Sequence, residues 1–238
     1  MENNVFTEHL TKFGLTRQEA CIYECLLSEG KTTGYEVAKK IGISRSNAYA
    51  SLASMTEKGA AYLVEEGSTR KYVPVPLDEF CRNSIRGLEG SAKWLIQHKP
   101  EERSHVEGYI TIEGADHILN KMKNLLITAE DRVYISCTRN YLLLLVEELD
   151  QLIATRKKLV IVTDQPVSLK NARVYVGEPR GREIGIITDS RYALIGEYGE
   201  GSMNTCLYSG QKNFVTLYKR ALANEIKLTA IQEADRRA

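Results

Sequence analysis

The sequence predicts a protein of mixed class, α+β / α/β, built from two domains. Its 238 residues are enough for two modest domains. Apolar residues recur at helical spacing up to residue 59, whereas strand-like runs and helical runs both occur after residue 104. A polar, proline-bearing stretch, Lys99–Ser104, separates the two patterns. We therefore expect an N-terminal domain at residues 1–76, a connector at 77–103, and a C-terminal mixed-sheet domain at 104–238.

The N-terminal domain begins with a series of short helices. The first is expected at Asn4–Phe13, and the second starts at Thr16, where Glu19 completes a capping box, and ends near Gly30. A third covers Thr33–Ile41, and Gly42 ends it. A fourth runs over Ser44–Gly59, with Ala48, Leu52 and Met55 on its inner face. The very short turn between the last two helices is typical of a helix-turn-helix.

The outer face of the Ser44–Gly59 helix favours contact with DNA. It carries small hydroxyls, an amide, a phenol and a guanidinium; the residues near its start are Ser44, Arg45, Ser46, Asn47 and Tyr49. A face that meets only water more often carries Glu/Lys pairs. Residues 31–58 hold five basic and two acidic residues, a local net charge of +3, although the whole chain has only +1. The alternative is a helical hairpin that packs against protein.

A hairpin follows this helix directly. Two strand-like runs, Ala60–Glu66 and Arg70–Val75, flank a short turn that contains Gly67. A hairpin in this position is a wing, and we expect Arg70 and Lys71 to contact the phosphate backbone. The predicted architecture is thus a winged helix-turn-helix that binds double-stranded DNA, with base contacts made by the second helix of the motif.

The connector, Leu77–His98, is predicted to be a long helix. Cys81, Ile85, Leu88, Ala92 and Leu95 form a heptad seam over about two heptads. Gly87 and Gly90 weaken the helix, so it needs a partner. We expect that partner to be a second subunit, which makes the protein a homodimer; the alternative is packing against the following domain.

Composition argues against membrane insertion, secretion and metal binding. No apolar run approaches the roughly 20 residues of a membrane helix, and the start of the chain lacks a signal peptide. Five scattered cysteines then favour the reducing cytoplasm. Cys21 and Cys25 lie four residues apart without two further ligands nearby, so we expect no metal and no cofactor. A thiol redox sensor using Cys21/Cys25 or Cys137/Cys206 stays an alternative.

The second domain alternates strands and helices before ending in several strands and a closing helix. Strands are expected at His105–Glu113, Arg132–Cys137, Lys158–Thr163, Arg173–Val176, Ile184–Thr188, Tyr192–Ile195 and Thr205–Tyr208. Helices are expected at Ala115–Ala129, Tyr141–Arg156 and Lys212–Ile231. This order indicates a sheet of mixed direction.

The first 76 residues resemble the winged-helix domain of TrmB-type transcriptional regulators. The resemblance covers about Gly14–Pro76 and rests on the run Gly42–Tyr49, on Lys58-Gly59, and on Tyr72–Pro76. Ala48 and Met55 stand where Val and Leu are more usual in that family, but both keep the inner face apolar. The resemblance implies a transcriptional regulator.

The second domain resembles phospholipase D-like domains, whose signature is H-x-K-x4-D followed by G-S-x-N. Aligned on Asp189, the histidine position holds Arg182 and the lysine position holds Ile184, whereas Gly201, Ser202 and Asn204 match. That reaction needs a histidine nucleophile, and a guanidinium stays protonated. The resemblance therefore implies a degenerate domain without phosphodiesterase activity.

A ligand site could survive in this degenerate domain. We expect a candidate pocket of Arg182, Asp189, Ser202 and Asn204 for an anionic or polyhydroxylated small molecule. The competing interpretation makes Asp189-Ser190 a tight turn and the glycine-rich stretch near Ser202 a loop. Sugar-sensing members of the family carry a further C-terminal domain, and this chain ends at Ala238, so we do not carry a sugar effector over.

These patterns together predict a dimeric, sequence-specific transcriptional regulator whose second domain dimerises and senses a small-molecule effector. Two alternatives remain besides the redox sensor. One is a winged-helix-targeted nucleic-acid phosphodiesterase, disfavoured because the His-Lys pair is missing. The other is an architectural DNA binder without an effector.

Overall fold

The computed structural model describes residues 2–67, 69–100, 108–199 and 204–235 and divides the chain into two compact units. The N-terminal unit covers Met1–Arg103 and the C-terminal unit covers Ser104–Ala238. Each unit has a hydrophobic core of its own. No helix in the described parts of the chain is long and apolar enough to cross a membrane.

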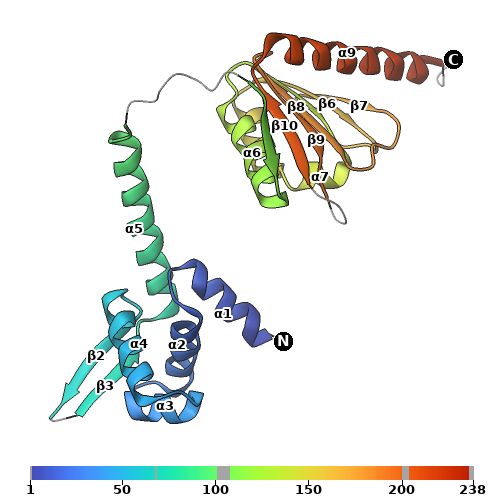
Figure 1. Cartoon of the computed structure of the whole chain (residues 1–238). Helices are drawn as coiled ribbons and strands as arrows, with labels where there is room; N and C mark the ends of the chain where they lie inside the picture. The colour runs from blue at the N-terminus through green and yellow to red at the C-terminus, as the bar shows by residue number, and fades with distance from the viewer. Residues whose placement is uncertain (1, 68, 101–107, 200–203, 236–238) are drawn as a thin grey trace. The chain divides into compact units, whose positions relative to one another are not determined.

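The N-terminal unit combines helices with a small antiparallel sheet (Figure 1). Its helices are α1 (Glu2–Lys12), α2 (Arg17–Glu29), α3 (Gly34–Ile41), α4 (Arg45–Glu57) and α5 (Leu77–Gln97). Its strands are β1 (Thr32–Thr33), β2 (Ala61–Glu66) and β3 (Thr69–Pro74), in the order β1-β3-β2. The predicted winged helix-turn-helix and long connector helix are confirmed. The two-residue strand β1 was not predicted, because so short a strand leaves no alternation to detect.

Side-chain caps fix where the short helices start. Thr16 accepts a hydrogen bond from the Glu19 backbone N–H at 3.2 Å, and the Glu19 carboxylate accepts from the Thr16 N–H at 2.7 Å. Thr33 and Glu36 repeat this capping box at the start of α3. Each box satisfies two backbone donors that a helix leaves unpaired at its first turn.

The core of the N-terminal unit ties α5 to the helices before it. Phe80, at the start of α5, is buried, with its ring centroid 5.6 Å from that of Tyr23 and 6.2 Å from that of Phe13. The Tyr23 hydroxyl donates to the Val75 carbonyl at 2.7 Å. Beyond this anchor α5 leaves its core: Ile85, Leu88 and Leu95 are 47%, 63% and 62% exposed. The predicted heptad seam is therefore not covered by the core of the N-terminal unit.

The C-terminal unit is a mixed seven-stranded sheet with helices on both faces (Figure 1). The strands are β4 (Ile110–Glu113), β5 (Arg132–Ser136), β6 (Lys158–Thr163), β7 (Ala172–Val176), β8 (Glu183–Thr188), β9 (Tyr192–Glu197) and β10 (Thr205–Ser209). They lie in the order β4-β10-β9-β8-β5-β6-β7. Among the described strands, β5-β6 and β6-β7 pair in parallel and the other pairs are antiparallel, which confirms the mixed direction.

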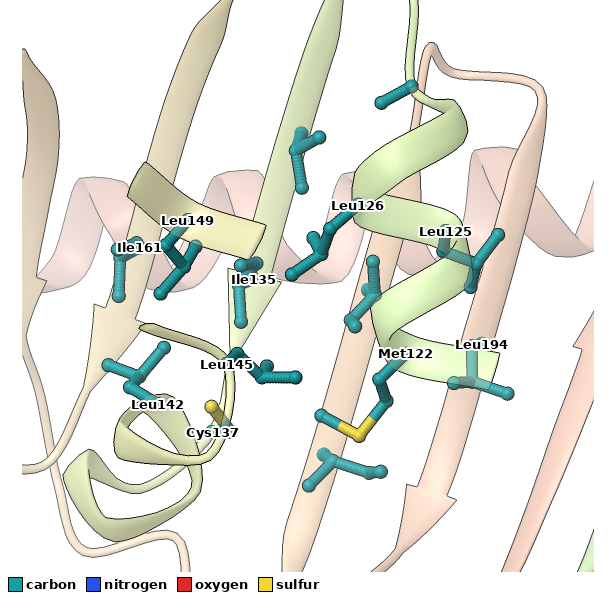
Figure 2. Packing of buried hydrophobic residues seen from close by; sticks show 14 of the residues in the cluster. Met122, Leu125, Leu126, Ile135, Cys137, Leu142, Leu145, Leu149, Ile161 and Leu194 are labelled. Atoms are coloured by element: carbon teal, nitrogen blue, oxygen red, sulfur yellow. The ribbon is translucent and has the colours of Figure 1, made fainter. Parts of the chain in front are cut away.

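Two apolar layers hold the helices on this sheet. On one face, α6 (Ala115–Thr128), α7 (Arg139–Leu143) and α8 (Val146–Ala154) cover the larger core. Figure 2 shows its side chains, among them Met122, Leu126 and Leu149 from the helices and Ile135 and Ile161 from the sheet. On the other face α9 (Lys212–Asp235) packs Val215 and Leu222 against the sheet. Strand β6 is continuously apolar because it is buried on both faces.

Two predicted elements differ in the structure. The single helix expected at Tyr141–Arg156 is two helices, α7 and α8, separated at Leu144–Leu145. Leu142 and Leu145 are both buried while Leu143 and Leu144 stay exposed, and neither glycine nor proline marks the break. The strand expected at His105–Glu113 is observed as Ile110–Glu113, and residues 105–107 lie outside the described residues.

Candidate nucleic-acid interface and ligand sites

The turn between α3 and α4 is fixed by local chemistry. Gly42 adopts a left-handed conformation with φ of 76°, which a residue with a side chain rarely adopts. The N–H groups of Gly42 and Ile43 both donate to the Ala38 carbonyl at 3.0 Å. Ser44 then caps α4, because its hydroxyl accepts from the Asn47 N–H at 3.2 Å. The start of α4 is thus held rigidly by backbone and side-chain bonds.

Helix α4 separates its core face from its outer face as the sequence predicts. Ala48, Leu52 and Met55 are fully buried in the core of the N-terminal unit. The outer residues at the start of the helix, which are Ser44, Arg45, Ser46, Asn47 and Tyr49, are all exposed. The face therefore presents hydrogen-bonding groups on a helix that cannot rotate without unpacking its core.

Two tyrosines shape the surroundings of Arg45. The Arg45 guanidinium lies over the ring of Tyr35, 4.3 Å from its centroid. The ring of Tyr49 packs on Gly34, where an added Cβ would come within 2.6 Å of it. The sequence reasoning did not single out Tyr35, which is 47% exposed. Tyr35 lies in the first turn of α3, and this turn adjoins the start of α4. That position could have indicated its contact with Arg45.

The wing is less basic than the sequence reasoning assumed. Arg70 lies opposite Glu65 across the hairpin, with Nε 3.4 Å from a carboxylate oxygen. Lys71 donates to Glu66 at 2.8 Å, and Lys31 pairs with the same carboxylate. The two lysines lower the pKa of Glu66 to about 2. The four charges of the hairpin cancel, so Arg70 and Lys71 do not form the free basic pair that their position in the wing suggested.

The predicted pocket of the second unit is only partly assembled. Arg182, just before β8, donates through Nη2 to the Gly199 carbonyl at 3.3 Å and to Asn204 Oδ1 at 3.4 Å. Asn204 Oδ1 also accepts from the Gly199 N–H at 2.7 Å. Arg182 and Asn204 are therefore neighbours, as expected. Ser202 lies outside the described residues.

Asp189 does not join this pocket, which corrects the prediction. It follows β8, whereas Arg182 precedes it, and six strand residues span about 20 Å. Its carboxylate accepts from the backbone N–H groups of Glu130, Asp131 and Arg132 at 2.8–2.9 Å. Asp189 and Ser190 have φ of 53° and 57°, and the Arg191 N–H donates to the Thr188 carbonyl at 2.9 Å. Asp189 is thus a hairpin-turn residue that also anchors the start of β5.

The sequence that forms α3, α4 and the wing matches a known family. Residues 10–78 match the model of the family described as the sugar-specific transcriptional regulator TrmB. The match covers less than a third of the chain and shows the likeness of this domain to the TrmB family. The match ends at the start of α5, so it includes the TrmB helix-turn-helix and wing but not the C-terminal unit.

Two curated proteins share longer stretches with the chain. The uncharacterized protein YrhO of Bacillus subtilis (strain 168) is 33% identical over 127 residues, which are 52% of this chain and 46% of that protein. The HTH-type sugar sensing transcriptional regulator TrmBL1 of Pyrococcus furiosus is 24% identical over 202 residues, 79% of this chain and 58% of that one. The chain thus spans about half the length of the curated relatives it matches.

Solved structures resemble the chain more distantly. TrmBL2, described as an archaeal chromatin protein, superposes with a TM-score of 0.41 at 18% identity over 93% of this chain and 97% of its own. Nuc of Salmonella typhimurium, a phospholipase D family member, gives a TM-score of 0.38 at 8% identity over 50% of this chain and 93% of its own. Both TM-scores are below 0.5, so no functional conclusion rests on them.

The three buried cysteines among the described residues are poor candidates for redox chemistry. Burial raises the pKa of the Cys137 thiol to about 12 and that of Cys206 to about 11. Burial also raises the pKa of Cys25, next to the exposed Cys21. Because the thiolate is the reactive form, burial makes these three thiols less reactive than exposed ones.

Proposed function

We propose that this protein is a dimeric, sequence-specific transcriptional regulator that binds double-stranded DNA through its TrmB winged helix-turn-helix. The observation that carries the proposal is the exposed, capped start of α4 on a helix whose opposite face is fully buried. A helix held in this way can enter the major groove with its first residues against the base edges.

The proposed contacts divide into two kinds. Ser44, Arg45, Ser46, Asn47 and Tyr49 are assigned to the DNA surface of α4. Arg45 is the strongest candidate for base reading, because a guanidinium can bind guanine O6 and N7 together and Tyr35 holds it in place. Arg70 is 67% exposed in its side chain and is assigned to phosphate, with Lys71 in support.

A second copy of the chain is proposed to pair along α5. The seam of Ile85, Leu88, Ala92 and Leu95 is exposed over about two heptads, whereas Cys81 is half-buried near the Phe80 anchor. Heptad seams of this type bury themselves against a second helix. A two-fold dimer would place two α4 helices on two half-sites of a palindromic operator.

The second unit is proposed to act in regulation rather than catalysis. Arg182 and Ile184 occupy the positions where phospholipase D-like enzymes carry their His and Lys, so we propose that the chain does not cleave phosphodiesters. A small-molecule effector that favours one spacing of the two DNA-binding units would change operator affinity by its differential affinity. Such a regulator acts in the cytoplasm.

Selection from a random duplex library tests this function. The full chain is incubated with the library, and bound duplexes are recovered and sequenced over several rounds. We expect a single motif with two inverted half-sites one helical turn, or a multiple of it, apart. Recovery of duplexes without a common motif would contradict sequence-specific binding and favour an architectural DNA binder.

A further inference from the structure

A cavity of about 900 Å³ lies at the end of the sheet opposite Arg182 and Asn204. Strands β4 and β9 are both antiparallel to β10, so the start of each lies beside the end of β10. The cavity opens there, between these strand ends and helix α6. Its volume falls within the range of roughly 300–1,000 Å³ that small-molecule sites occupy.

One stripe of α6 forms a wall of this cavity. Lys121, Asn124, Leu125 and Thr128 recur at spacings of three, one and three residues, which places them on the same side of the helix. Leu125 belongs to the core, whereas Lys121, Asn124 and Thr128 carry polar groups. This wall of the cavity therefore carries an ammonium, an amide and a hydroxyl next to the apolar side chain of Leu125.

Two stacked tyrosines form the facing wall. The ring centroids of Tyr192 and Tyr208 lie 5.7 Å apart, with the planes inclined at 19°. Gly210 permits this arrangement, because a Cβ there would come within 3.0 Å of the Tyr192 ring. Tyr192 is 38% exposed and lines the cavity, so it presents a flat aromatic surface to a ligand.

Lys121 is the cavity's one cation, among the described residues, without an acidic partner. Its Nζ lies 3.7 Å from the centroid of the Tyr208 ring. The other charges that line the cavity have partners: Arg191 pairs with Glu130 at 3.2 Å, and Asp189 accepts three backbone N–H groups. Lysines that only cover apolar surface keep their ammonium in water. Lys121 is half-buried, and burial lowers the pKa of its ammonium.

We propose that this cavity binds a small molecule that carries one anionic group, a carboxylate or a phosphate, attached to a flat ring. Lys121 would neutralise the anion, Tyr192 would stack on the ring, and Asn124 and Gln211 would bond to polar groups at its edge. The site is distinct from the Arg182 region. The role of this cavity as an effector site rests on the proposed regulatory function. Binding of the small molecule to the cavity does not depend on that function.

The cavity adjoins the first described residues of the C-terminal unit. The cavity includes Gly108 and Ile110, at the start of the C-terminal unit, and the Ser209 hydroxyl donates to the Gly108 carbonyl at 2.7 Å. The same hydroxyl accepts from the Gln211 N–H at 3.0 Å. A ligand bonded to Gln211 would therefore lie beside the bonds that hold Gly108, at the start of the described part of the C-terminal unit.

Binding of four probes to the full chain tests the site by calorimetry. Phenyl phosphate and benzoate carry both features, benzyl alcohol lacks the charge, and inorganic phosphate lacks the ring. We expect at least one of the first two to bind with a dissociation constant on the order of 1 mM, as suits so small a ligand. Benzyl alcohol and inorganic phosphate should bind at least about tenfold more weakly. Whichever of phenyl phosphate and benzoate binds more tightly shows whether the site prefers a phosphate or a carboxylate.

Matched variants locate the bound probe. Lys121→Met should weaken binding of the anionic probe about tenfold or more, and Tyr192→Ala should weaken it as well. Lys158→Met is the control, because Lys158 also lies over an aromatic ring, 5.6 Å from the Tyr134 centroid, but outside this cavity. Thermal melting shows whether each variant is folded.

Three results would overturn the proposal: no saturable binding of either anionic ring compound up to about 10 mM, equal binding of benzyl alcohol, or equal losses in Lys121→Met and Lys158→Met. DNA affinity is measured separately, without a probe. Probe binding without DNA binding refutes the proposed function alone, and DNA binding without probe binding refutes this site alone.

Discussion

Asp189 shows at the residue scale how one carboxylate can tie the turn between β8 and β9 to the start of β5. Asp189→Asn keeps a side chain that tolerates positive φ but replaces an acceptor oxygen by an N–H donor facing backbone donors. We expect a loss of about 1–3 kcal/mol in local stability. Hydrogen exchange at Glu130, Asp131 and Arg132 should become faster; unchanged exchange would mean that other contacts protect these amides.

The same carboxylate gives the C-terminal unit an acid-sensitive contact. Burial raises the pKa of Asp189. The three backbone N–H groups and the charge of Arg191 together lower this pKa by more, so the net shift is downward. A carboxyl whose pKa is lower in the folded state stabilises that state fully above its unfolded pKa of about 3.9. The contribution is lost as pH falls through the folded pKa. Asp189→Asn should therefore flatten the stability profile below about pH 4.

Arg45 and Arg70 should differ in what their loss does to DNA binding. Arg45→Ala should cost about 1–3 kcal/mol on the selected duplex and relax base preference at one position. Arg70→Ala should weaken binding to all duplexes alike and reduce the salt slope by about 1. Fluorescence anisotropy over a salt series separates the two. Loss of specificity in Arg70→Ala, with none in Arg45→Ala, would reverse these roles.

Sequence reasoning found the residues of this surface that lie on one helix and missed those that depend on a second element. The alternation of buried Ala48 with exposed Arg45 follows from helical period alone. The contact of Tyr35 with Arg45 and the pairing of Glu66 with Lys71 depend on packing between elements. Asp189 was misplaced because strand length, not motif spacing, decides which side chains meet.

At the scale of elements, α5 carries two glycines that only weaken it. A Cβ at Gly90 would meet nothing within 4 Å, and the residue is not in the heptad seam. Gly90→Ala should therefore stabilise the helix by about 1 kcal/mol, measured as slower hydrogen exchange along α5. Gly42→Ala is the contrasting control, because its φ of 76° makes the same change destabilising. Faster exchange in Gly90→Ala would indicate a close approach by a partner.

The elements themselves were mostly predictable, and the exceptions have physical reasons. Long periodic segments such as α6 and α9 and the continuously apolar β6 appear where expected. No glycine or proline lies at the break between α7 and α8. Packing against the sheet determines which of the leucines there are buried. Strand β1 exists because Thr32 and Thr33 pair with β3, a contact that local pattern does not contain.

On the scale of the whole molecule, the account requires two copies of the chain. The double change Leu88→Glu and Leu95→Glu places charges in the α5 seam and should convert the dimer to a monomer in light scattering. Ile127→Glu is the control: Ile127 is 53% exposed on α6 and lies outside the seam. A dimer that survives the double change would move the two-fold contact to another surface.

The central claim is that the exposed start of α4 reads a DNA sequence. The most direct measurement compares the affinity of the full chain for the selected duplex with its affinity for a shuffled duplex of the same composition, by fluorescence anisotropy at one salt concentration. We expect a ratio of about 10³ or more, which Arg45→Ala should lower. Equal affinities for the two duplexes would contradict it.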